Sequence, residues 1–202
     1  MRIGRGIKIE YLSTTWMLVE AAGTIGTGLL AGSLALLAFG GDSIVELISG
    51  AVVVKHLRAG SPSEVENRRT ELLTACLLVG LIPVIAVGAV VSYISGFRAE
   101  DSPIGIAIAA GAVIIMLYLW YEKKTIGRDT SCLPLSIDAV ESFTCLFMAV
   151  ALLGGLLAQF LFGLWWADYV ATALILFFVA RGARESFQEI RKGKSSGTSL
   201  HP

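Results

Sequence analysis

Long apolar stretches dominate this chain and restrict it to membrane folds. A helix needs about 20 mostly apolar residues to cross the hydrocarbon core of a bilayer. Of the 202 residues, 55% are hydrophobic and only 16% are charged, whereas soluble domains carry about 25% charged residues. We therefore predict an all-α polytopic membrane protein. Six spans are expected: 12–31, 33–55, 71–95, 103–121, 134–158 and 165–185.

The first span has two possible interpretations at its start and two at its end. Basic residues within 2–8 precede it, as in a signal peptide, but Glu20 lies in its middle and its length exceeds that of a cleavable core. We expect a retained helix. The segment Ala31-Gly32-Ser33 either forms a turn or continues one very long helix. Because each half is long enough to span a bilayer, we favour the turn.

Basic residues set the orientation. With the N-terminus inside, fifteen of the 16 Lys and Arg residues fall on the cytoplasmic side and only Arg98 falls outside. The prediction is a cytoplasmic N-terminus (1–11), a six-helix transmembrane domain (12–190) and a short, disordered cytoplasmic tail (191–202). Short loops suggest a prokaryotic inner membrane. Equal numbers of acidic and basic residues give no indication of a nucleic-acid partner. The apolar spans make the lipid bilayer the expected partner.

Acidic residues lie within the spans, where charge is costly and marks function. The Lys and Arg residues, by contrast, are expected at span ends, where they can reach water. These carboxylates must therefore be protonated, hydrated in a cavity, or matched by a cation that is not part of the chain. They are Glu20, Asp42, Glu46, Asp138 and Glu141.

Helical spacing groups these acids. Asp42 and Glu46 are four residues apart and share one face of the second span. Glu141 and Cys145 have the same spacing on the fifth span, with Asp138 about one turn earlier. If the two faces meet, Asp42, Glu46, Glu141 and Cys145 form a four-ligand cage. Carboxylates with a thiolate suit zinc, another first-row divalent ion or cadmium, with no organic cofactor.

Several residues have two interpretations. Glu20 is either a protonated packing residue or part of a proton path, and Asp138 is either a structural acid near the cytoplasm or a neighbour of the ligands. Cys145 alone would be a packing residue, and its register with Glu141 favours a ligand. Ser43 and Ser142 lie next to the proposed ligands, and with Glu20 and Asp138 they are candidates either for contacts to the ligands or for a proton path. No His or Lys is placed to activate the two serines as nucleophiles, so we expect no catalytic residue and no enzyme activity.

Three runs resemble motifs of the cation diffusion facilitator family. The run from Ala31 to Glu46 resembles its second helix, in which A-G-S-x-A-L leads into an acidic D-S-x-x-D motif. The run from Ser136 to Cys145 looks like its fifth-helix motif, D-A-x-H-x-x-x-D. Trp166-Ala167-Asp168 is similar to the W-A-D stretch that opens the sixth helix. Together the runs cover roughly residues 12–190.

The resemblance implies a homodimer that exports divalent metal, usually zinc, in exchange for protons. It places the ion on Asp42, Glu46, Glu141 and Cys145, between helices two and five. Here Glu141 replaces the usual His and Cys145 replaces the usual Asp, so cadmium, cobalt, iron and manganese join zinc as candidates. We expect a minimal, divergent member of that family without its cytoplasmic metal-sensing domain. The alternative is a non-transporting metal-binding or assembly membrane protein on a transporter scaffold.

Overall fold

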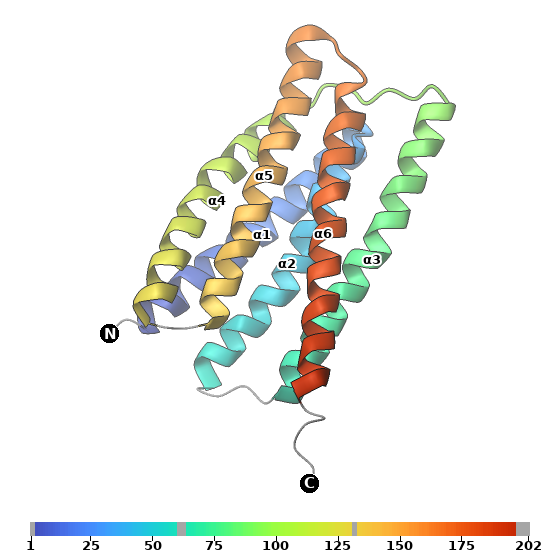
Figure 1. Cartoon of the computed structure of the whole chain (residues 1–202). Helices are drawn as coiled ribbons and strands as arrows, with labels where there is room; N and C mark the ends of the chain where they lie inside the picture. Colours follow the sequence, from blue (N-terminus) through green and yellow to red (C-terminus); the bar gives the residue numbers. More distant parts are fainter. Residues whose placement is uncertain (1–2, 60–63, 131–132, 197–202) are drawn as a thin grey trace.

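Six helices form one bundle in the computed structural model, which describes residues 3–59, 64–130 and 133–196. They run alternately up and down, so α1 begins and α6 ends at the same end of the bundle, the lower end in Figure 1. The predicted all-α, six-helix fold is confirmed. The helices are α1 (Ile3–Ala31), α2 (Leu34–Ala59), α3 (Glu64–Ile94), α4 (Pro103–Thr130), α5 (Leu133–Phe162) and α6 (Ala167–Ser196).

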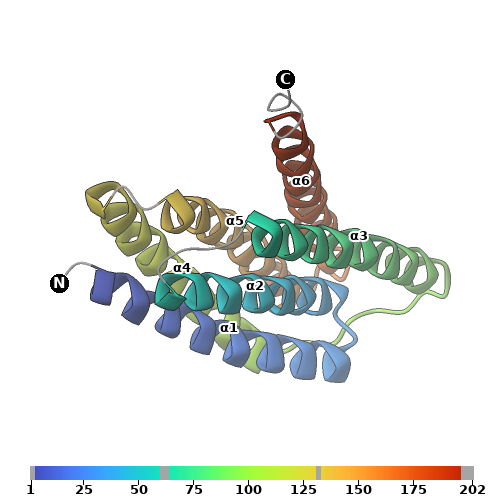
Figure 2. The ribbon, with the colours of Figure 1, turned by 90° about the horizontal axis from the view of Figure 1, so that it is seen from below.

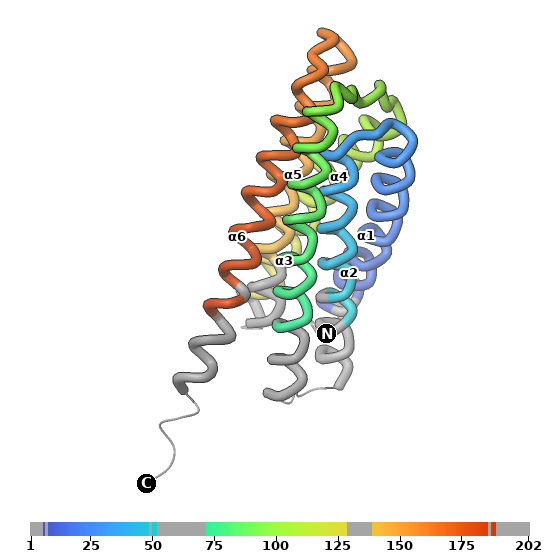
Figure 3. Tube along the Cα trace, turned by 90° about the vertical axis from the view of Figure 1, so that its right-hand side faces the viewer, coloured from blue at the N-terminus to red at the C-terminus, as the bar shows by residue number. Residues whose placement is uncertain are grey.

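Helix α2 occupies the centre of the bundle. It packs against α1, α3, α5 and α6. Figure 2 shows α1 along the outer side of α2, and Figure 3 shows α3 between α6 and α2. Residues on α2 can therefore meet side chains from several helices, which makes α2 a suitable carrier for a site inside the bundle.

Large apolar side chains cover the outside of the bundle, whereas some acidic side chains are buried inside it. Glu20 is 0% exposed, whereas Leu30 on the same helix is 85% exposed. Leu18 and Val19, the neighbours of Glu20, are also exposed. Polar groups that face the bundle interior and apolar groups that face outward are what a lipid environment requires.

By length and composition alone, three helices are apolar enough to cross a membrane within the described parts of the chain. The other three helices carry buried acids: Glu20 in α1, Asp42 in α2 and Asp168 in α6. The three apolar segments are Leu72–Ile94 in α3, Pro103–Arg128 in α4 and Ala139–Phe162 in α5.

The chain turns between α1 and α2, as the sequence predicts. Gly32 has a φ of 65°, a conformation that favours glycine, and the Ser33 N–H donates to the Gly28 carbonyl at 3.0 Å, which closes the end of α1. The Ser33 hydroxyl donates to the Asp168 carboxylate, and the Leu34 N–H donates to its other oxygen at 3.1 Å. The start of α6 thus fixes the start of α2.

Gly40 lets α1 and α2 approach closely just before the acidic pair of α2. A Cβ atom at Gly40 would lie 2.6 Å from the Thr24 hydroxyl and 3.2 Å from the backbone nitrogen of Ile25, closer than real contacts allow. Asp42 follows two residues later. The absence of a side chain at Gly40 therefore helps to set the position of Asp42 relative to α1.

The helices extend beyond the predicted spans. Helix α1 begins at Ile3 instead of 12, and α6 continues to Ser196, so the prediction of an unstructured tail from 191 differs from the structure. Hydropathy marks the length in contact with lipid, whereas Glu, Lys and Arg continue a helix readily into water. Residues 197–202 lie outside the described part.

Candidate metal site

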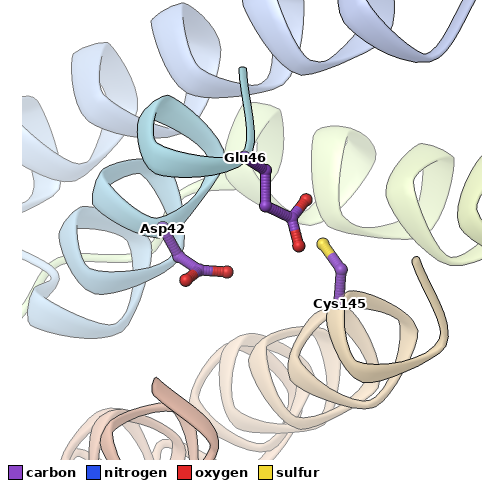
Figure 4. A group of neighbouring side chains, drawn as sticks. All are labelled: Asp42, Glu46 and Cys145. Carbon is purple, nitrogen blue, oxygen red and sulfur yellow. The ribbon is translucent and has the colours of Figure 1, made fainter. Parts of the chain in front are cut away.

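Two acidic side chains of α2 and one thiol of α5 point into the same space (Figure 4). Asp42 and Glu46 stand one turn apart on α2, and Cys145 faces them from α5. One ligand atom from each of the three residues lies within 4.8 Å of the other two. Small side-chain rotations would bring these atoms to the separations that one bound divalent ion requires.

A cavity of about 240 Å³ adjoins this group, with walls from α2, α3, α5 and α6. Asp42 and Glu46 line it, and Asp42 and Cys145 are buried. Toward the lower end of α6 the wall includes Arg181 and Glu185, which form an exposed ion pair with 2.8 Å between Nε and Oε1. The cavity therefore extends from the acidic pair toward the surface on the lower side of the bundle.

Glu141 lies apart from the close group. It lines the same cavity from α5, one turn below Cys145, but it is not among the residues whose ligand atoms lie within 4.8 Å. The structure thus brings together Asp42, Glu46 and Cys145, and the ligand role of Glu141 stays a prediction.

A comparison with protein families identifies the fold. The family described as the cation efflux transmembrane domain matches residues 11–192, a segment that includes most of every helix. The chain belongs to the cation efflux family. The predicted resemblance to cation diffusion facilitators is thereby confirmed, and the protein is a cation transporter embedded in a membrane. No curated protein sequence matches the chain.

In this cation efflux domain Glu20 lies beside the close group without belonging to it. Its carboxylate accepts hydrogen bonds from Trp16 Nε1 and from the Ser43 hydroxyl, each at 2.7 Å. Ser43 follows Asp42 directly, so Glu20 supports α2 next to the acidic pair. Sequence reasoning missed Trp16, although its spacing of four residues from Glu20 is a usable signal.

Of two further residues predicted for the proton path, the structure describes the side chain of only one. Ser142 is buried on α5, between Glu141 and Cys145 along the helix. The side chain of Asp138 lies outside the described residues, so its position stays a prediction.

A buried lysine corrects the prediction that basic residues lie at span ends within reach of water. Lys123 on α4 is 0% exposed, and its Nζ lies 3.7 Å from Glu10 Oε2 on α1 and 2.9 Å from the Ser13 hydroxyl. The sequence placed Lys123 in a loop after the span 103–121, but α4 continues to Thr130 and directs this side chain toward α1. The bundle therefore contains a second polar cluster, formed by Glu10, Ser13 and Lys123.

Proposed function

We propose that this protein exports a divalent metal cation that binds between α2 and α5. The proposed ligands are Asp42, Glu46, Glu141 and Cys145. One observation carries the proposal: three of these side chains bring ligand atoms within 4.8 Å of one another beside a cavity of about 240 Å³. Zinc is the first candidate, and cadmium, cobalt, iron and manganese follow because a thiolate among carboxylates also suits softer ions.

Charge supports a mobile cation at this place. Two carboxylates close together in a medium of low dielectric constant repel each other unless a proton or a cation lies between them. A metal ion that binds there displaces protons, and protons that return displace the metal. The same acidic group thus supports exchange of a divalent ion for protons without the histidine that the family usually has.

The two ends of the bundle support loading from the cytoplasm. The cavity extends toward the lower end, where the basic residues predict the cytoplasm. At the upper end, three hydrogen bonds hold the α3–α4 loop against α1, α5 and α6. The Glu100 N–H donates to the Ala31 carbonyl at 2.8 Å, Gln159 Nε2 to the Ala99 carbonyl at 2.8 Å, and the Tyr169 hydroxyl to the Phe97 carbonyl at 2.8 Å.

A binding experiment tests the ligand assignment. Zinc affinity of the purified full-length protein in detergent is measured by competition with a fluorescent chelator, for Asp42→Asn and Glu46→Gln. We expect each to weaken binding by at least about tenfold, since loss of even outer-shell partners has that effect. Asp101→Asn and Glu100→Gln are matched controls, because both side chains are exposed in the α3–α4 loop. Wild-type affinity in the Asp42→Asn protein would refute the assignment.

A flux experiment separates transport from binding alone. The protein is reconstituted into vesicles that contain a metal-sensitive dye and a pH-sensitive dye. Metal flux with opposite proton movement supports the exchanger. Metal binding with no flux supports the alternative, a non-transporting metal-binding or assembly membrane protein. The homodimer and the prokaryotic inner-membrane location stay predictions.

A further inference from the structure

Thr74 on α3 differs from six other threonines of the described residues. In a helix, a threonine hydroxyl commonly donates to the carbonyl four residues earlier. In the described part of the chain, Thr74 Oγ1 is buried and has no hydrogen-bond partner. Six threonines form the bond to the carbonyl four residues earlier, at distances from 2.7 to 3.2 Å: Thr14, Thr24, Thr27, Thr125, Thr144 and Thr172.

The unpaired hydroxyl belongs to the wall of the metal cavity. Thr74 lines the cavity of about 240 Å³ together with Asp42 and Glu46. Glu46 Oε2 is also buried without a hydrogen-bond partner among the described residues. A buried polar group without a partner is destabilising, so its presence calls for a ligand that satisfies it. Both groups lie on one cavity, which points to one shared ligand.

We propose that Thr74 is a specificity-determining residue of this site, whose hydroxyl contacts the bound cation directly or through one water molecule. The proposal rests on the proposed function and adds α3 to a site otherwise built from α2 and α5. The hydroxyl is a hard oxygen ligand, whereas the Cys145 thiolate is a soft one. Thr74 thus favours zinc and manganese, while Cys145 favours cadmium.

The test compares selectivity, which a merely structural role would not change. Zinc and cadmium dissociation constants are measured by chelator competition on the purified full-length chain, for wild type, Thr74→Val, Thr74→Ser and Thr144→Val. Thr144 is the matched control, because it lines the same cavity but already donates to the Val140 carbonyl at 3.2 Å. We expect Thr74→Val to weaken zinc relative to cadmium by about 3- to 10-fold, the range of one hydrogen bond.

Thr74→Ser should restore the wild-type ratio of zinc to cadmium affinity, and Thr144→Val should leave it unchanged. If Thr74→Val does not fold, Thr74→Ala provides the same comparison. An unchanged ratio in a folded variant without the hydroxyl, or an equal shift in Thr144→Val, overturns the role of Thr74 and leaves the proposed function intact. A wild-type protein that binds no divalent cation overturns the proposed function, and this proposal with it.

Discussion

The buried lysine of α4 offers a sharp test of how the bundle balances charge. Lys123 Nζ lies 3.7 Å from Glu10 Oε2, and the two side chains are 0% and 1% exposed. Lys123→Met keeps most of the apolar volume and removes the charge. The Glu10 carboxylate then lacks its lysine in a region where water cannot replace it, so we expect a large loss of stability.

The size of the expected loss of stability follows from the burial of both Lys123 and Glu10. Removal of one partner of a buried ion pair costs about 3–5 kcal/mol, whereas replacement of both partners by neutral groups is often close to neutral. For a chain of this length about 1 kcal/mol corresponds to about 2–4 °C, so the midpoint of thermal unfolding in detergent should fall by about 6–20 °C. The double variant Glu10→Gln/Lys123→Met should recover most of that loss.

Lys124 supplies the matched control. It is the next residue on α4, it is exposed, and its Nζ lies 4.7 Å from the centre of the Trp120 ring. An exposed cation–π contact contributes about 0.5–1 kcal/mol, so Lys124→Met should lower the midpoint by only a few degrees. Equal shifts in Lys123→Met and Lys124→Met, or a double variant no more stable than Lys123→Met, would refute the argument that Glu10 depends on Lys123.

Three further substitutions test other contacts by thermal unfolding. Asp168→Ala removes both acceptors at the start of α2 and should cost about 1–2 kcal/mol, the usual effect of a lost helix cap. Gly40→Ala forces a Cβ against Thr24 and should cost about 1–3 kcal/mol, whereas Gly26→Ala, with nothing within 4 Å, should be neutral or stabilising. Glu20→Gln replaces one acceptor by a donor that faces Trp16 or Ser43 and should cost about 1–3 kcal/mol; an unchanged midpoint would count against these hydrogen bonds.

Periodic and local features of the sequence were sufficient for the number of helices and for part of the site. Each apolar stretch predicts a helix because a bilayer requires one, and a spacing of four predicts that Asp42 and Glu46 share a face. The meeting of Cys145 with this pair followed from the assumption that α2 and α5 face each other, and the structure brings the three together. Glu141 shows the limit: it has the same spacing of four residues from Cys145, yet its carboxylate is not part of the close group.

Contacts between distant helices could not be derived from the sequence. Lys123 follows an apolar span, where a lysine normally reaches water, and only the packing of α4 against α1 buries it beside Glu10. Thr74 has no sequence feature that separates it from threonines that bond to their own helix. Its significance depends on the cavity between α2, α3, α5 and α6, which no local pattern specifies.

The buried acids of this bundle differ in how their charge is balanced, and this difference supports the proposed position of the cation. Glu10 has Lys123 at 3.7 Å, and Glu20 accepts two hydrogen bonds of 2.7 Å. Among the described residues, Glu46 Oε2 has no such partner, and it lies on a cavity next to Asp42. Hydropathy treats these acids alike, because each lowers the apolar character of its helix. In the part of the chain that the structure describes, this unpartnered oxygen beside the cavity supports our proposal that the mobile cation binds at Asp42 and Glu46.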